Sequence, residues 1–317
     1  MKRLLTIFCC VFIANLAYAQ NSFFFGHYMF NPTNLNPSWS GAENTGYVAF
    51  QHRSQWAGYA TSFDGSGGAP NSQMLTLGVP VRNLPISSLG LNVVTETLGA
   101  LTNFQALLPI TYSRQLAKGN LHIGIAPGVF SQTQNFNLFR ANDPNDDLIQ
   151  GGREVQTKFN MSAGVLFQSK KNWFLGLGAV NLMQPGFDFG KSIENKQKIS
   201  YSLIGGYTLS ISEVLEIGPT ILIRTNTVSS TFDLGGIMTL NQKMWVGLSY
   251  RKSESAIIYL GYKLLQDNRL SVGYSFDYVI QNRDAKAATS HELFLRYDLP
   301  DLVLGGRKRV VTPRFSF

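Results

Sequence analysis

The chain has 317 residues, enough for a sizeable core, but only 15% of them are charged, and Gly, Phe and Tyr number 30, 22 and 13. This composition is typical of a membrane β-barrel, and the formal net charge of +8 is dispersed over short turns, which argues against a nucleic-acid partner. After the first twenty positions there is no run of about eighteen apolar residues, so helical membrane proteins are excluded and a closed barrel remains.

Residues 1–19 have the three parts of a secretory signal peptide. Lys2 and Arg3 precede an apolar run, and Ala17-Tyr18-Ala19 is the small-x-small pattern that signal peptidase recognises. Cleavage after Ala19 would remove both cysteines and leave Gln20 first. We therefore predict an exported chain without a lipid anchor or disulfides.

Residues 20–44 lack strand periodicity and are rich in Asn and Pro. Two Asn-Pro steps force extended or turn geometry, so the segment is either an ordered lead-in to the first strand or a packed plug or docking segment. Trp56, where the first strand meets its loop, suits an interfacial anchor, with a partner contact as the alternative. The candidate plug or partner contacts are Tyr28, Phe30, Asn31, Pro32, Asn36, Pro37, Trp39, Arg53 and Trp56.

From residue 45 to residue 299 the sequence repeats a period of two. In 270–278, large apolar or aromatic residues alternate with Ser, Gly and Asp, so one face of the strand is apolar and the other is small and polar. This pattern indicates a wall between lipid and a confined wet lumen, and predicts an all-β, transmembrane antiparallel β-barrel of about fourteen strands. The predicted strands are 45–51, 74–81, 88–95, 103–113, 120–130, 159–167, 173–181, 200–209, 215–224, 231–240, 244–251, 256–263, 270–278 and 291–297.

The connections between the strands fall into two sets. Three are long, at 54–73, 131–158 and 183–199, whereas those at 117–119, 169–171, 210–212, 241–243 and 266–268 are tight hairpin turns. Outer-membrane barrels carry short turns on the periplasmic side and longer loops outside. We therefore predict external long loops and two periplasmic termini, including a basic tail at 300–317.

Side chains of the wall are not expected to fill the lumen of such a barrel. A fourteen-stranded wall lies between the side-chain-filled eight-stranded type and the open porins, so wall residues alone cannot fill it. The N-terminal segment and the long loops are the available material. Within the strands, Pro109, Pro127 and Pro219 cannot donate to a neighbour and predict local bulges.

No catalytic, metal or cofactor site is predicted, and the chain is not expected to be an enzyme. The four histidines lack ligand spacing, and the strand period sends His291 to the opposite face from Ser290 and Glu292. A serine of a neighbouring strand could still pair with His291, as in membrane-embedded lipases. The acidic run 142–147 lacks the spacing of a calcium loop, and the Gly-rich run 65–68 neither follows a strand nor opens a helix.

Several short motifs are specific in combination and cover nearly the whole mature chain. They are Tyr28-Met29-Phe30-Asn31-Pro32, Asn36-Pro37, Gly41, Arg53-x-Gln55-Trp56-x-Gly58, and the segments 246–251, 273–277, 290–292 and 313–315. The pattern resembles the PorP/SprF family of outer-membrane proteins in Bacteroidetes. One departure is Ser38-Trp39-Ser40-Gly41, where the family more often has Ala-Tyr-Ala-Gly.

The resemblance implies a component or accessory of the type IX secretion system. Such a barrel would support the export or surface attachment of secreted proteins such as gliding adhesins. Its implied partners are outer-membrane lipid, the exported proteins and other envelope proteins, with a periplasmic lipoprotein as one candidate. The alternative function is a porin-like or hydrophobic-solute transport channel, which should conduct in planar bilayers.

Overall fold

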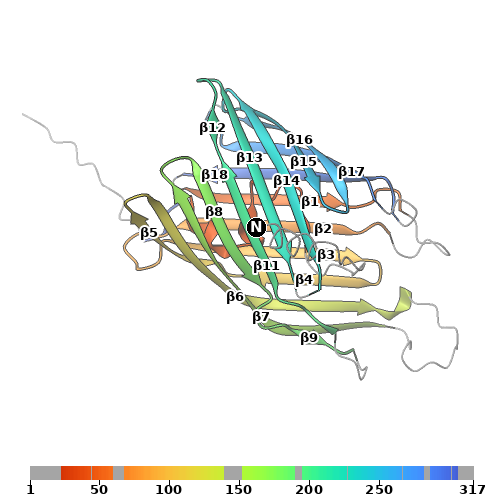
Figure 1. The fold of residues 1–317 in the computed structure, drawn as a ribbon. Helices are drawn as coiled ribbons and strands as arrows, with labels where there is room; N and C mark the ends of the chain where they lie inside the picture. Colours follow the sequence, from red (N-terminus) through yellow and green to blue (C-terminus); the bar gives the residue numbers. More distant parts are fainter. Residues whose placement is uncertain are drawn as a thin grey trace, which may run out of the picture.

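The computed structural model describes residues 23–43, 45–59, 68–138, 152–189, 195–226, 228–265, 267–281, 286–300 and 302–305. The predicted signal peptide, residues 65–67, the acidic run 142–147 and the tail from residue 306 lie outside the described residues. Among the residues described, no helix is long and apolar enough to cross a membrane. The strands of the large sheet (Figure 1) are β1 (Gly46–Ser54), β2 (Asn71–Pro80), β3 (Ser88–Leu98), β4 (Leu101–Leu107), β5 (Ile110–Leu116), β6 (Gly119–Asn135), β7 (Arg153–Ser169), β8 (Trp173–Val180), β11 (Ser200–Tyr207), β12 (Leu209–Ser210), β13 (Leu215–Thr225), β14 (Ser230–Leu240), β15 (Met244–Arg251), β16 (Ser255–Leu264), β17 (Leu270–Val279) and β18 (Thr289–Leu299).

The sheet closes on itself into a barrel. Strands at neighbouring positions in the wall pair antiparallel, and β1 pairs with β18 from Gly46 opposite Leu299 to Ser54 opposite His291. Because β4 and β5 share one position in the wall and β11 and β12 share another, the 16 strands of the described sheet form a closed barrel of 14 strands. The predicted fold and strand count are therefore confirmed.

β6 and β7 are the strands that extend furthest beyond their predicted bounds. β6 and β7 pair along their whole lengths, from Gly119 opposite Ser169 to Asn135 opposite Arg153. The predicted strands end at residue 130 for β6 and begin at residue 159 for β7. The parts beyond these residues are largely polar on both faces, so the sequence there lacks the alternation on which the prediction depends. Strand pairing needs no apolar face once the strand has left the lipid.

The predicted bulges are absent, because the prolines interrupt the ladder without inserting a residue. Leu107 pairs with Gly128 and Ile110 with Ile125, so the register is the same on both sides of the break at Pro109. Pro127 and Pro219 lie within the continuous strands β6 and β13. The missing donors are accommodated by short gaps in the ladder.

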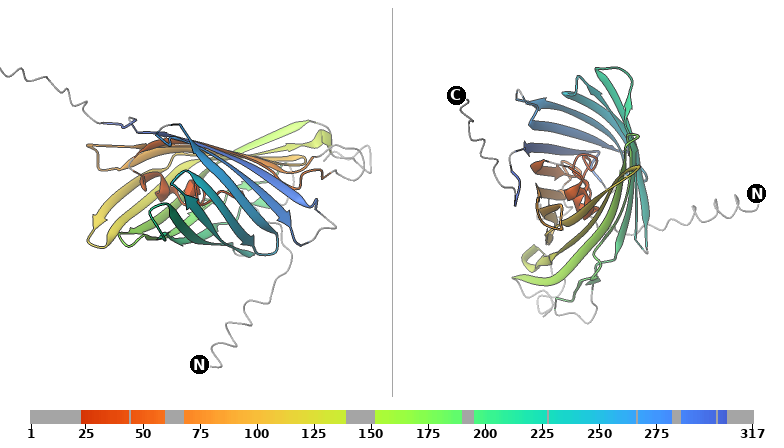
Figure 2. Two further views of the ribbon diagram at one scale, coloured as in Figure 1. Left: turned by 90° about the horizontal axis from the view of Figure 1, so that it is seen from above. Right: turned by 90° about the vertical axis from the view of Figure 1, so that its left-hand side faces the viewer.

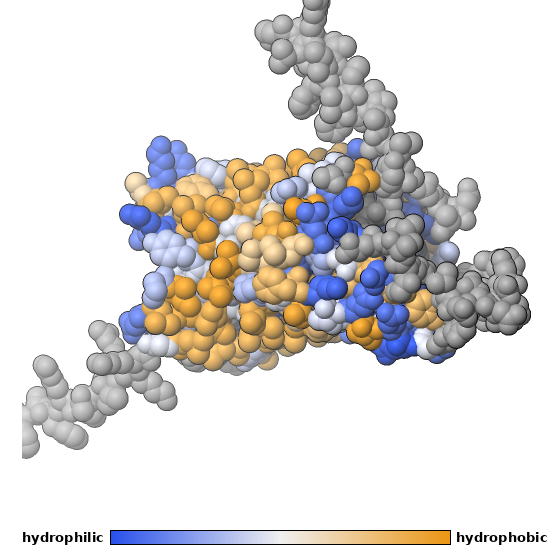
Figure 3. Space-filling model, turned by 90° about the horizontal axis from the view of Figure 1, so that it is seen from below, coloured by the Kyte–Doolittle hydropathy of each residue, from blue (hydrophilic) through white to orange (hydrophobic). Residues whose placement is uncertain are grey.

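The two faces of the wall follow the predicted alternation. In β17, Tyr274 is 41% exposed, whereas Ser275 and Asp277 are buried on the opposite face. The same alternation places exposed apolar residues on the outer face of β15 and β16. On the side of the barrel shown in Figure 3, hydrophobic residues form a broad band between more polar ends. The band is the lipid-facing surface of the barrel.

We call one end of the barrel the long-loop end, since it carries the β1–β2, β6–β7 and β8–β11 connections. The β8–β11 connection contains a two-stranded sheet of β9 (Gly186–Phe187) and β10 (Asn195–Lys196), and η3 (Phe136–Leu138) follows β6. The opposite, short-turn end carries the predicted hairpin turns and the end of β18. Residues 23–43, here called the inner segment, lie inside the wall (Figure 2) and contain η1 (Pro32–Asn34) and η2 (Pro37–Gly41).

Candidate functional site: the inner segment and the lumen wall

The inner segment runs through the lumen from one end of the barrel to the other. Phe23 stacks on Phe130, near the long-loop end of β6, with ring centroids 6.2 Å apart. At the other end Glu43 forms an ion pair with Arg296, near the end of β18. The described N-terminal end of the chain therefore lies at the long-loop end, opposite the described C-terminal end.

The two Asn-Pro steps shape the middle of the segment into two 3₁₀ turns. Asn31 and Asn36 are the N-cap residues, and each following proline occupies the first helical position, where no N–H is required. The side chain of Asn36 accepts hydrogen bonds from Ser38 N at 3.0 Å and Ser38 Oγ at 2.6 Å. Its amide donates to Val165 O of β7 at 3.0 Å, so the cap also fixes the turn to the wall.

A row of small wall residues makes room for η2. Gly124, Gly164 and Gly178 are paired side by side on β6, β7 and β8. A Cβ atom on any of them would overlap atoms of residues 35–38. Ser202 continues the row on β11, and its Oγ donates to Leu35 O at 3.0 Å. The backbone of the inner segment thus lies directly against the wall.

Glu292 of β18 binds the inner segment through three donors. Gly26 N, His27 N and His27 Nδ1 donate to its carboxylate at 2.5, 2.9 and 2.8 Å. Arg53 of β1 lies 3.5 Å from the same carboxylate and 2.6 Å from Asp277 of β17. All of these side chains are buried, so each charge depends on its partners for solvation.

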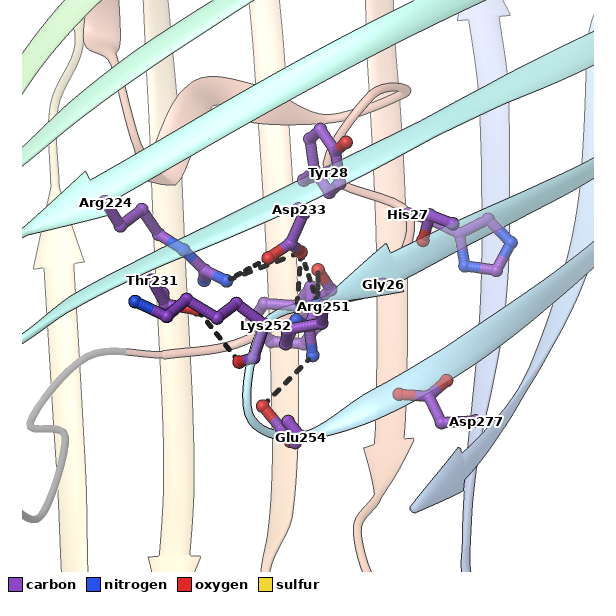
Figure 4. Close-up of polar contacts among 12 residues, drawn as sticks. Gly26, His27, Tyr28, Arg224, Thr231, Asp233, Arg251, Lys252, Glu254 and Asp277 are labelled. Carbon is purple, nitrogen blue, oxygen red and sulfur yellow. Dashed lines mark hydrogen bonds and ion pairs between the residues drawn. The ribbon is translucent and has the colours of Figure 1, made fainter. Parts of the chain in front are cut away.

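A second charged cluster (Figure 4) lies beside the first, since Glu254 comes within 4.0 Å of Arg53. Asp233 of β14 accepts from Arg224 at 3.2 Å and from Arg251 at 2.9 Å, and Arg251 also lies 3.7 Å from Glu254. Arg251 donates to Phe25 O at 3.5 Å, and the ring of Phe24 lies 3.9 Å from the Arg224 guanidinium carbon. The wall therefore holds the start of the inner segment with both carboxylates and guanidinium groups.

Apolar and amide contacts join the rest of the inner segment to the wall. The ring of Phe30 lies 5.0 Å from that of Trp245 and 5.5 Å from that of Phe294, and Trp39 makes an edge contact with Phe174 at 5.2 Å. Asn31 donates to Gln51 and Thr76, and Tyr28 packs in a buried cluster with Ile204 and Leu222. A cavity of about 20 Å³ between Phe23, Leu35 and Arg224 has room for about one water molecule.

The structure brings together most of the predicted contact residues but not all of them. Those of the inner segment lie against the lumen wall, and Arg53 joins the Glu292 cluster from β1. Trp56 lies beyond β1 at the long-loop end, where its backbone N–H donates to Ser290 Oγ at 3.0 Å and Lys286 lies 5.2 Å from its ring. The inner-segment set comprises Tyr28, Phe30, Asn31, Pro32, Asn36, Pro37 and Trp39.

The main contacts that the sequence did not reveal are His27, Glu292, the Asp233 cluster and the glycine row. A carboxylate or guanidinium at a lumen-facing strand position was the available signal, because a confined lumen needs a partner for each charge. His291 points away from Ser290 and Glu292, as predicted, and its Nδ1 lies 2.6 Å from the Tyr274 hydroxyl. No group of three or more potential metal ligands occurs among the residues that the structure describes.

Comparison with known structures supports the barrel architecture. The Ralstonia pickettii toluene transporter TbuX is 9% identical over 86% of this chain and 93% of its own, with a TM-score of 0.51. A TodX deltaS2S3 mutant monoaromatic hydrocarbon channel is 10% identical over 88% and 95%, also with a TM-score of 0.51. At these identities the likeness concerns the fold alone.

Comparison with protein families identifies the chain more specifically. No curated protein matches the sequence. A model described as type IX secretion system membrane protein PorP/SprF matches residues 17–297, which include the inner segment and nearly the whole wall. The fold and the match are those of an outer-membrane secretion or transport protein. The chain belongs to the PorP/SprF family of type IX secretion system membrane proteins.

Proposed function

We propose that this protein is a closed, non-conducting barrel that supports the export or surface attachment of secreted proteins by binding other envelope proteins. The inner segment acts as its plug. The observation that carries this proposal is the packing of the lumen, because residues 23–43 contact the wall on opposite sides and from one end to the other. A secretion component without a pore must act through its surfaces.

The proposal includes a polarity and a set of partners. The long-loop end would face the exterior, as in other outer-membrane barrels, and the short-turn end the periplasm. Exported proteins such as gliding adhesins would then meet the long-loop end, and periplasmic envelope proteins, with a lipoprotein as one candidate, would meet the short turns. The predicted signal peptide supplies the route to the envelope.

Deletion of residues 20–41 behind the intact signal tests the role of the inner segment. The deletion removes no hydrogen bond of the wall ladder, since β1 begins at Gly46, so the barrel should still assemble and show heat-modifiable mobility. We expect the full chain to be silent in planar bilayers and the truncated chain to conduct and to lose support of export. Normal export by the truncated barrel would reduce the inner segment to a lead-in.

The conductance measurement also distinguishes the secretion role from the channel alternative. The structural neighbours include hydrocarbon channels, but their likeness extends to the fold only. Robust open conductance by the full-length protein, or saturable uptake of a monoaromatic hydrocarbon, would favour a transport channel. A closed full-length barrel that still restores export would support the secretion role.

A further inference from the structure

Four exposed cationic side chains lie together at the short-turn end of β5, β6, β7 and β8, which are neighbours in the wall (Figure 1). Lys118 is in the β5–β6 turn, and Lys170 and Lys171 are in the β7–β8 turn. The backbones of these two turns are in contact, since Lys170 N donates to Lys118 O at 3.1 Å. Arg114 of β5 completes the set, here called the basic patch.

The positive charge of the basic patch is not balanced by the wall around it. No Asp or Glu occurs at residues 97–142 or 155–187, which contain both turns and the strands on either side of each. The flanking turns add Arg82 on one side and Glu213 and Glu216 on the other, which makes five cations against two carboxylates. The other described charges at the short-turn end do not cancel this excess, since they are Lys243, Lys263, Arg269 and Arg296 against Glu43, Asp267 and Asp298.

Arg114 lies on the outer face of the wall. The residue before it, Ser113, points into the lumen, where its Oγ donates to Gly41 O at 3.4 Å. Because strand side chains alternate, Arg114 points outward, and it is exposed there. Arg114 is paired opposite Leu121 of β6, which is paired opposite Phe167 of β7. One cation of the basic patch therefore begins on the lipid-facing surface, near its short-turn edge.

Exposed aromatic rings mark the membrane boundary at this level. Trp173 of β8 packs on Phe167, with ring centroids 5.3 Å apart, and is paired opposite Tyr207 of β11. The Trp173 and Tyr207 side chains are 38% and 42% exposed. Trp and Tyr are enriched where a membrane protein passes from hydrocarbon to headgroups. The lysines of the two turns follow directly beyond these rings, at the level of the headgroups.

We propose that the basic patch binds the headgroup phosphate of an anionic phospholipid. Guanidinium and ammonium groups are the side chains that recognise phosphate, and cations beside a membrane attract anionic lipid. An acidic soluble protein fits less well, because it would have to displace lipid to reach Arg114, where a headgroup is already present. Under the proposed polarity the lipid belongs to the periplasmic leaflet, but its binding does not depend on the secretion role.

Tryptophan fluorescence of the full-length barrel in phosphatidylcholine nanodiscs measures the preference. Increasing fractions of acyl-brominated phosphatidylglycerol or acyl-brominated phosphatidylcholine are added in parallel, because bromine quenches an indole that it contacts. Trp173 is the reporter, since Trp39 and Trp245 lie in the lumen. We expect phosphatidylglycerol to quench at lower fractions, and the difference to disappear in Trp173→Phe. Equal quenching of the unmodified barrel by the two lipids would overturn the proposal.

The variant Lys118→Gln/Lys170→Gln removes two cations from the basic patch and no hydrogen bond of the wall ladder. We expect the affinity for phosphatidylglycerol relative to phosphatidylcholine to fall about fivefold for each cation removed. The control is Lys243→Gln/Lys263→Gln, which removes the same charge from another pair of adjoining backbones, where Lys263 N donates to Lys243 O at 2.8 Å. The control should keep its preference. Equal losses in both variants would show an effect of net charge alone and contradict the assignment.

Two further measurements separate the lipid from an acidic protein. Added salt should weaken the preference of the unmodified barrel, because the groups are exposed to solvent. Poly-glutamate is the probe for a protein ligand. If it binds the solubilised barrel, loses affinity in Lys118→Gln/Lys170→Gln and the nanodiscs show no lipid preference, the patch binds an acidic protein and the lipid proposal fails. A barrel without lipid preference that still supports export would leave the secretion role intact.

Discussion

At the scale of single residues, Glu292 is the strongest link between the wall and the inner segment. Its carboxylate accepts from two backbone N–H groups and the His27 ring and lies next to Arg53, all within the buried lumen. A buried carboxylate is costly unless it is fully paired, so the segment and the wall stabilise each other at this point. Removal of Glu292 leaves donors on both sides without an acceptor.

Glu292→Ala should therefore loosen the inner segment. Breaking one partner of a buried charged group typically costs about 3–5 kcal/mol, and here the cost falls on the attachment of the segment. We expect intermittent conductance in planar bilayers and protease cleavage within residues 23–43 of the folded barrel. Glu213→Ala, at an exposed position in the β12–β13 turn, is the control and should remain silent and resistant. Indistinguishable behaviour of the two variants would show that Glu292 does not hold the segment.

At the scale of elements, each strand of the wall has one face toward the lipid and one face toward the lumen. β17 presents Tyr274 to the lipid and Ser275 and Asp277 to the lumen, and the lumen face meets the inner segment rather than open water. Ser275 is fully buried, and a Cβ at Gly26 would lie 3.0 Å from its Oγ. The lumen face is therefore as restrictive as the lipid face, for steric rather than solvation reasons.

The position of the lipid-facing band can be tested by placing an arginine at two different depths in the membrane. Tyr274 lies in the middle of β17 and Leu264 at the short-turn end of β16, and both side chains are exposed. An arginine in mid-membrane costs about 2–4 kcal/mol and one near the interface about 0–1 kcal/mol. Tyr274→Arg should thus reduce the yield of heat-modifiable barrel well below that of Leu264→Arg. Equal yields would mean that the membrane boundary is misplaced.

At the scale of the whole molecule, the two described ends of the chain lie at opposite ends of the barrel. Phe23 is at the long-loop end, and residues 302–304 lie across the short-turn end, where Leu304 bonds to the β2–β3 turn. The mature terminus predicted at Gln20 and the tail from residue 306 lie outside the described residues, so the periplasmic location of both termini stays a prediction.

Epitope accessibility checks the arrangement. An epitope placed after Ala19 of the full chain should be accessible to antibody in intact cells, whereas one after Phe317 should require permeabilisation. The reason is that the inner segment passes through the lumen and its first described residue, Phe23, lies at the long-loop end. If both epitopes are detected only after permeabilisation, the N-terminus returns to the periplasm and the polarity prediction for both termini holds.

The sequence predicted the wall well because its signals are local. Alternation with a period of two identifies each strand, and connection length identifies the two ends, so fourteen strands could be placed before any contact was known. Where the lipid no longer imposed alternation, as in the outer parts of β6 and β7, strand ends were missed. The Asn-Pro steps also indicated an ordered N-terminal segment, although not its path.

The sequence by itself thus determined the class of protein, the faces of the strands and the residues of the candidate plug. The tertiary structure alone decided that Glu292 accepts hydrogen bonds from the backbone of Gly26 and His27, that three glycines form one row and that β8 pairs with β7 only from Ala163 to Gln168. These features join residues far apart in the chain through the closure and register of the sheet. A period of two fixes which face a residue occupies, but only the closed barrel fixes what lies opposite it.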